Sequence, residues 1–304
     1  MGRFKATRIV ALAAAVVFVF CVAGGCSGKA KKKPLSEVPI NVDSFAEKSP
    51  ASYALGLNAD PKTWDWKSKA NFLYQKSTQV LPDRVEIVDV VTAGPKTYTM
   101  RLTCRKNVFL EVMSSHVTEE EGGKILDESR VEVKAGQLRQ NFSHAAPSVM
   151  DYPDNTISQA GLMRIVTRLP REKGIIYTFP SYFDPQEPRP ETGPDMGLEC
   201  KGETTVTVAD RKVACTLYVL TGTRRECKFY VDAEGVLQFM EMDGGYTRMA
   251  YLTPDEFAKF PKSLAAPPMR LMGASVTEPL QPKQVSPAPA YQPAAATPAE
   301  GKAK

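Results

Sequence analysis

Apolar and polar residues alternate in long runs of this chain, and this period constrains its fold more than any other feature. Across residues 96–104, apolar side chains at every second position alternate with threonine and arginine, as in a strand with one buried face. A second strand is predicted over residues 107–116, followed by an exposed turn at 119–123. Residues 124–134 and 137–143 then predict a hairpin, so this part of the chain is expected to form an antiparallel meander.

The same pattern returns in the second half of the chain. Strands are predicted over residues 212–220, 226–232, 236–242 and 246–252. The Asp-Gly pair at 243–244 is typical of a tight hairpin turn. Two meanders in one chain predict a mainly β (α+β) fold, in which a large curved antiparallel sheet, a half-barrel, carries one to three packed helices.

Apolar residues at helical spacing predict one amphipathic helix over residues 158–169. Arg164 and Arg168 are expected on its solvent face, because the apolar stripe lies on the other side. A short helix is predicted after Thr253, which is followed at once by a proline and three residues later by a glutamate, as in a capping box. Residues 60–74 predict a first helix; residues 64–66 within them also fit a strand, and the helix is favoured.

The N-terminal segment has the order of an export signal. Residues 1–8 are basic, residues 9–23 are almost wholly apolar, and small residues lead to Cys26. The apolar run is shorter than the ~20 residues that a spanning helix usually needs. The segment resembles the lipobox of bacterial lipoproteins, in which the cysteine becomes the acylated first residue of the mature chain. The resemblance assigns lipid attachment to Cys26, while Cys21 or an uncleaved signal anchor stays open.

Four segments are expected along the chain. They are a signal peptide (1–25), a lipidated basic tether (26–44), a half-barrel-like domain (45–261) and a disordered tail rich in proline and alanine (262–304). In Gram-negative lipoproteins, a serine such as Ser27 after the cysteine is compatible with outer-membrane sorting. The resemblance therefore implies a protein anchored at the periplasmic face of the outer membrane.

The charge of the folded part argues against one class of partner. The signal peptide contains three of the 39 basic residues and none of the 34 acidic ones, so the remainder is close to neutral. Proteins that bind nucleic acid carry a concentrated basic face. We therefore expect a membrane partner through acylated Cys26, with a lipid or an envelope protein as a further partner, and no nucleic acid.

Four runs in the second half of the chain carry a resemblance to a known group. Residues 213–218, 229–235, 243–245 and 253–257 are similar to the C-terminal strands of periplasmic half-barrel proteins. These include lipoprotein carriers of the LolA and LolB type and related uncharacterised bacterial lipoproteins. In the carriers, a twisted antiparallel sheet wraps around helices and leaves an apolar hollow that holds acyl chains. The resemblance thus implies an apolar hollow here as well.

The concave face of such a sheet is the candidate binding site. Six apolar side chains are candidate ligand contacts: Leu102, Phe179, Tyr182, Leu217, Phe229 and Phe239. The aromatic residues of the 177–197 loop either roof a cleft or close the end of the core. Two functions are consistent with this pattern. One is an anchored module that binds lipid or another apolar ligand; the other is a structural lipoprotein, packed shut, whose loop or tail contacts an envelope protein.

The sequence offers little for catalysis or metal binding. His116 and His144 are its two histidines, and neither has a partner at the spacing of metal ligands. Motifs for a serine nucleophile, a phosphate loop or a dinucleotide are missing as well. We therefore expect no catalytic residue, no metal and no cofactor, in a protein that is not an enzyme.

Four cysteines lie in the predicted domain. Cys104, Cys215 and Cys227 are in phase with predicted buried strand faces, where a free thiol packs as a small hydrophobe. A hairpin turn centred near Thr223 would keep Cys215 and Cys227 apart. Buried thiols are therefore favoured, although an oxidising compartment allows disulfides and pairing through Cys200 stays open.

Overall fold

The structure, a computed structural model, describes residues 30–57, 72–143, 146–183, 189–245 and 247–261. Its main element is one sheet of 15 strands. In chain order these strands are β1 (Lys31–Pro34), β2 (Ala51–Leu57), β3 (Phe72–Val80), β4 (Arg84–Ala93), β5 (Lys96–Arg105), β6 (Val112–Glu121), β7 (Lys124–Lys134), β8 (Gln137–Phe142), β9 (Ser148–Asp151), β11 (Ile175–Thr178), β14 (Gly197–Val208), β15 (Arg211–Thr221), β16 (Cys227–Val231), β17 (Leu237–Met242) and β18 (Thr247–Leu252).

The spatial order of these strands joins the two predicted meanders. It runs β1-β11-β14-β15-β16-β17-β18-β2-β3-β4-β5-β6-β7-β8-β9, so the second meander continues into the first where β18 pairs with β2. All neighbours are antiparallel except β1 and β11, which are parallel. The sheet has β1 at one edge and β9 at the other and does not close into a barrel.

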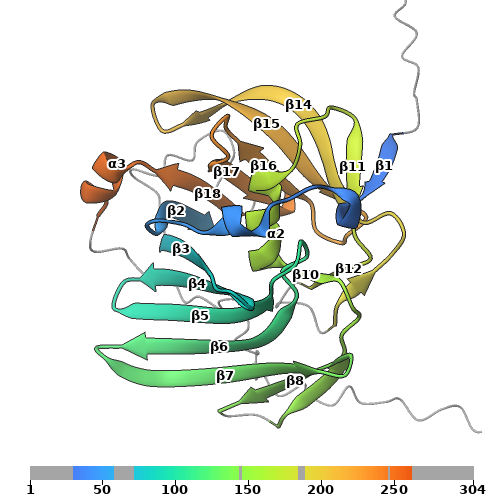
Figure 1. The fold of residues 1–304 in the computed structure, drawn as a ribbon. Helices are drawn as coiled ribbons and strands as arrows, with labels where there is room; N and C mark the ends of the chain where they lie inside the picture. The colour runs from blue at the N-terminus through green and yellow to red at the C-terminus, as the bar shows by residue number, and fades with distance from the viewer. Residues whose placement is uncertain (1–29, 58–71, 144–145, 184–188, 246, 262–304) are drawn as a thin grey trace, which may run out of the picture.

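Short helices and a second, three-stranded sheet complete the fold. The helices are α2 (Gln159–Ile165), α3 (Pro254–Ala258) and the 3₁₀ turns η1 (Leu35–Glu37), η2 (Val42–Phe45), η3 (Val166–Arg168) and η4 (Asp243–Gly245). The small sheet consists of β10 (Thr156–Ser158), β12 (Ser181–Phe183) and β13 (Glu191–Thr192). Figure 1 shows α2 between the two parts of the curved sheet, with β14 to β18 on one side and β3 to β8 on the other. The predicted fold class, a large curved antiparallel sheet with a few packed helices, is confirmed.

Both predicted helix starts are found. The Ser158 hydroxyl accepts a hydrogen bond from the Gly161 backbone N–H (3.0 Å) and so caps α2. A Cβ at Gly161 would lie 3.2 Å from the same Ser158 Oγ, which is closer than an ordinary van der Waals contact. At α3, Thr253 and Glu256 form the complete capping box that the sequence predicts.

The main apolar core fills the concave side of the sheet. Cross-strand register places Tyr53 opposite Tyr74, which in turn lies opposite Val91. The two tyrosine rings are 5.8 Å apart between centroids and tilted by 52°. Leu162 and Ile165 of α2 are buried in the same core, so the helix is held by its apolar stripe.

Two predicted boundaries in the first meander are wrong. Residues 107–111 do not begin a strand, because the Asn107 side chain accepts a hydrogen bond from the Phe109 backbone N–H (3.1 Å) and Leu110 has a positive φ of 49°. The strand β6 therefore starts five residues later than predicted and includes the acidic residues 119–121. The turn itself is Gly122-Gly123, both with positive φ. The prediction of a first helix over residues 60–74 is also wrong at its end, because residues 72–74 lie in β3. Residues 60–71 lie outside the described residues.

The predicted tether at 26–44 is also corrected. Lys31–Pro34 form β1, which pairs with β11, a strand more than 140 positions away. Leu35 follows directly and is 1% exposed in the main core, together with Val38. The folded domain therefore begins at about residue 31 rather than 45. Pairing with so distant a strand leaves no local signal in the sequence.

A turn centred near Thr223 would place Val219 opposite Cys227, but the observed register of β15 against β16 differs from this prediction by one residue. Val219 lies opposite Lys228, and Thr216 lies opposite Val231. A shift of one residue exchanges the two faces of a strand. The main core therefore contains Tyr218 and Leu220, and Leu217 projects to the other face of the sheet. Cys215 and Cys227 consequently project to opposite faces. All four described cysteines are buried, and none of them forms a disulfide bond in the described chain.

Candidate functional site

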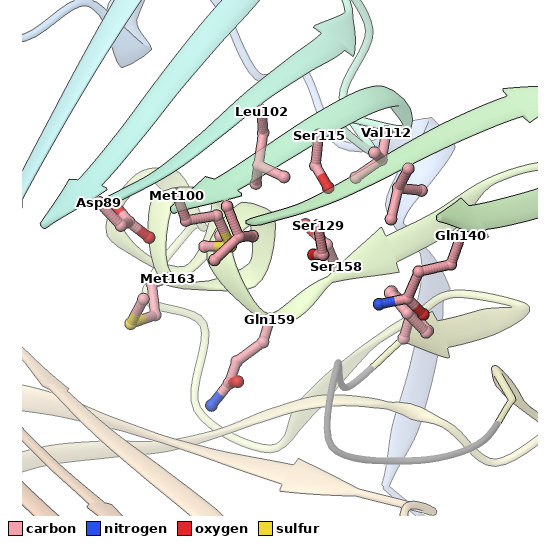
Figure 2. A pocket seen from close by; sticks show the side chains of 14 residues that line it. Asp89, Met100, Leu102, Val112, Ser115, Ser129, Gln140, Ser158, Gln159 and Met163 are labelled. Atoms are coloured by element: carbon pink, nitrogen blue, oxygen red, sulfur yellow. The ribbon is translucent and has the colours of Figure 1, made fainter. Parts of the chain in front are cut away.

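A pocket lies on the concave side of the sheet, between α2 and strands β4 to β8 (Figure 2). Its cavity has a volume of about 50 Å³. Apolar side chains form most of the sheet wall, namely Met100, Leu102, Val112, Val117 and Val131. The site is therefore a small, mainly apolar hollow at the end of the core near β6 to β8.

Cross-strand register explains why these side chains share one face. Met100 lies opposite Val117, which lies opposite Ser129 on the next strand. Leu102 lies opposite Ser115 in the neighbouring row. Directly opposed residues of adjacent strands project to the same side of a sheet. The alternating pattern of the first meander thus forms the wall, with two serines among its apolar residues.

The opposite wall comes from α2 and the small sheet. Ser158, Gln159, Ala160 and Met163 line the pocket from the helix and its cap, and Phe183 lines it from β12. Because the Ser158 hydroxyl accepts a backbone hydrogen bond of α2, it is already occupied. Met163 adds a long, flexible side chain that can adapt to a neighbour.

Ser115 and Ser129 provide polar groups that have no partner among the described residues. Neither hydroxyl makes a hydrogen bond with a residue that the structure describes, and both line the cavity. In Figure 2 the Ser115 hydroxyl extends from the sheet toward α2. Gln159 is also buried; its amide nitrogen donates to the Met242 Sδ (3.0 Å), while its Oε1 has no partner in the described chain. The pocket thus offers unpaired hydrogen-bonding groups within apolar walls.

Asp89 closes one end of the pocket and forms a buried ion pair with Arg164. The Arg164 guanidinium donates from Nη2 to Asp89 Oδ1 (2.5 Å) and from Nη1 to Oδ2 (3.3 Å), and its Nε donates to Thr78 Oγ1 (3.2 Å). Burial alone would lower the pKa of the guanidinium, but the Asp89 carboxylate outweighs this effect and raises the pKa. The prediction that Arg164 faces solvent is therefore wrong: its side chain is 2% exposed.

A second ion pair lies beside the first. Lys76, which is opposite Asp89 in the register, donates to Glu47 Oε1 (2.8 Å). Burial and the nearby Arg164 charge lower the pKa of Lys76. Two acids and two bases thus form a neutral polar layer between α2 and β3–β4, in which each charge is paired within the protein.

Arg168 does not turn toward open solvent either. Its guanidinium donates to the Ser44 carbonyl oxygen from Nε (3.1 Å) and Nη2 (2.8 Å), and to the Gly235 carbonyl oxygen (3.3 Å). It therefore ties η2 and the turn after β16 to the end of η3. An amphipathic pattern cannot reveal such contacts, because arginine has a long apolar stem that buries easily.

The six candidate ligand contacts do not share one site. Leu102 lines the pocket. Phe179, Tyr182 and Phe229 lie in the main core, each at most 4% exposed, where they fill space rather than line a cavity. The aromatic loop therefore mainly closes the end of the core, although Phe183 from it reaches the pocket wall.

Leu217 and Phe239 lie on the other face of the sheet, against the prediction. Phe239 belongs to a second, smaller apolar cluster, with its ring centroid 5.7 Å from that of Tyr230. Leu217 lies opposite Tyr230 and so shares that face. The register of β15 against β16 explains the position of Leu217, while Phe239 lies opposite the same Tyr230 from β17. The serines at inward positions of β6 and β7 were the available signal for the pocket, since they interrupt an otherwise apolar face.

The histidines form no metal site in the described chain. His116 projects from β6 beside Glu128, with Nε2 and Oε1 2.8 Å apart, and Glu128 also accepts from Arg130 (2.6 Å). His144 lies outside the described residues. Among the residues that the structure places, no three His, Cys, Asp or Glu side chains are grouped as metal ligands would be.

Comparisons with known proteins find a similarity among solved structures. No family model matches the chain, and no curated protein matches it. Among solved structures, it is similar to a β-barrel-like protein of domain of unknown function DUF1849 from Brucella abortus, at 12% sequence identity and a TM-score of 0.41, over 67% of this chain and 95% of that one. Within the described ranges, no helix has the length and apolar character needed to cross a bilayer.

Proposed function

We propose that this protein is an envelope lipoprotein, anchored through Cys26, whose half-barrel domain binds an apolar ligand in the pocket between α2 and β4–β8. The observation that carries the proposal is the combination of apolar walls with the unpaired hydroxyls of Ser115 and Ser129. Binding sites typically combine apolar surface with a few polar groups that orient the ligand. The role is binding rather than catalysis, because each charge beside the pocket is paired within the protein.

The size of the cavity limits how the ligand binds. Ligand pockets usually measure ~300–1,000 Å³, whereas this cavity measures about 50 Å³. A bound chain would therefore have to displace part of the wall. Met100 and Met163 line it from opposite sides, and unbranched methionine side chains change rotamer at low cost. We expect the occupied pocket to be larger than the empty one, with these two residues moved.

A second function, contact with an envelope protein, is favoured by a different observation. Val149 is 59% exposed on β9, which forms one edge of the sheet, and Ile125 is 52% exposed on β7, two strands from that edge. An edge strand with exposed apolar side chains can pair with another chain. In this alternative the small pocket stays empty and the β9 edge is the interaction surface.

Native mass spectrometry separates these functions. Residues 27–304, which include every described residue, would be exported to a bacterial periplasm without the acylated cysteine, and co-purified molecules would be extracted into organic solvent. We expect an acyl-chain species at near-stoichiometric occupancy. A bare chain that also takes up no fluorescent lipid would exclude the binding function.

A matched pair of variants locates the site. Ser115→Phe fills the pocket from the inward face of β6, whereas Ser114→Phe adds the same ring on the outward face of the same strand. We expect Ser115→Phe to abolish the bound species and Ser114→Phe to retain it. Equal occupancy in both variants would place any ligand elsewhere.

A further inference from the structure

The charges around the pocket indicate which ligands it accepts. Asp89 is the one ionisable side chain among the described residues of the pocket wall. Both of its carboxylate oxygens accept hydrogen bonds from Arg164, so its charge is already neutralised within the protein. An anionic ligand would meet this carboxylate and no opposite charge. Burial of an unpaired charge is strongly unfavourable, so the pocket disfavours anions.

A cationic ligand meets a different obstacle. It would have to compete with Arg164 for the Asp89 carboxylate, and success would leave the Arg164 guanidinium buried without its partner. Removing one partner of a buried ion pair is strongly destabilising. The ion pair of Asp89 and Arg164 therefore disfavours both anionic and cationic ligands in the pocket.

Uncharged polar groups, in contrast, find partners in the pocket. The hydroxyls of Ser115 and Ser129 can each donate and accept a hydrogen bond, and the Gln140 amide can do both as well. Figure 2 shows Asp89 and Gln140 at opposite ends of the pocket, with the serines between them. The available partners suit a hydroxyl, ester or amide group on an apolar chain.

We infer that the ligand of this pocket is an uncharged amphiphile, with an acyl or alkyl chain and a hydroxyl, ester or amide head, rather than a fatty acid, an anionic phospholipid or a cationic amphiphile. The inference rests on the proposed function, because it specifies the ligand of the same pocket. It follows from the paired state of Asp89 and from the unpaired state of the two serines.

Three probes with the same chain length test the inference. The mature chain, residues 27–304, would be titrated with 1-monooleoylglycerol, oleate and oleylamine, each below its aggregation concentration, and bound protein counted by native mass spectrometry. We expect the monoacylglycerol to bind at least about tenfold more tightly than either charged probe. Equal or tighter binding of oleate or oleylamine would overturn the inference and leave the proposed function standing. Binding of none of the three would overturn both.

A gain of charge provides the matching control. Gln140→Lys places a cation at the inward face of β8, with a flexible stem that can reach water when the pocket is empty. Asn141→Lys adds the same charge on the outward face. We expect Gln140→Lys to raise oleate affinity about tenfold relative to the monoacylglycerol, and Asn141→Lys to leave the ratio unchanged. An unchanged ratio in both variants, despite retained monoacylglycerol binding, would show that wall charge does not set the preference.

Discussion

Arg164 and Asp89, 75 positions apart in the chain, form a bidentate ion pair in the interior of the half-barrel. The pair joins α2 to β4 and lies directly beside the pocket. Because both side chains are at most 3% exposed, neither charge is screened by solvent. The position of the helix over the sheet therefore depends on a polar contact as well as on apolar packing.

Removing one partner of this pair should destabilise the protein strongly. Arg164→Met leaves the Asp89 carboxylate buried without a partner, and we expect it to lower the free energy of unfolding by about 3–5 kcal/mol in urea denaturation. The double variant Arg164→Met/Asp89→Leu should recover most of this loss, because it removes both charges. Arg130→Met, at an exposed pair with Glu128, should cost less than about 1 kcal/mol. A loss at Arg164 as small as that at Arg130 would contradict the buried geometry.

The domain should lose stability in alkali. Burial raises the pKa of the Cys104 thiol from 9.0 to about 12. Above pH 9 the unfolded state then releases a proton that the folded state still holds, so the free energy of unfolding falls as the pH rises from about 9 to about 12. Denaturation series at pH 8, 9, 10 and 11 measure this slope. Cys104→Ala should show a shallower slope than the parent chain, and an identical slope would mean that Cys104 titrates normally.

Shortening the side chain of Leu35 tests where the folded domain begins. Leu35→Ala removes a side chain that is 1% exposed in the main core, and we expect a loss of about 2–5 kcal/mol in the free energy of unfolding. Lys32→Ala, in the same segment, removes an exposed ion pair with Asp195 and should change stability by less than about 1 kcal/mol. If both variants were neutral, residues 31–35 would be a tether after all.

Lipid attachment is expected at Cys26 and can be measured directly. Metabolic labelling with palmitate should give a labelled full-length protein that partitions into membranes. Cys26→Ser should abolish the label and release the protein from the membrane fraction, whereas Cys21→Ser should retain both. Loss of label in Cys21→Ser alone would move the anchor to that residue.

Local patterns were sufficient to predict the strands of both meanders, the two helix starts and the helix cap at Thr253. The hairpin of β7 and β8 and the capping box at Thr253 depend on residues close together in the chain, and both were predicted correctly. The faces of β15 were not, because a one-residue difference in the turn between β15 and β16 exchanged them. The fold class can be predicted from the period of apolar residues alone. The face of a strand that is buried can be predicted only when its register against the neighbouring strand is known.

The candidate site was only partly predictable. Leu102 was identified from its strand period, but Arg164 was assigned to solvent because it lies off the apolar stripe of its helix. Its partner Asp89 lies on β4, far from α2 in the chain, so the pair exists only through tertiary packing. The pairing of β1 with β11 escaped prediction for the same reason, since parallel strands that are far apart leave no hairpin signal.

The early start of β1 also limits how a lipid-anchored chain could move. From Cys26 to Lys31 the backbone advances five residues, which span at most ~18 Å when fully extended. A domain held by an acyl chain at Cys26 would therefore keep its β1 edge within that distance of the headgroups. It would pivot about this edge instead of ranging across the periplasm, and it would exchange ligands with the leaflet that anchors it.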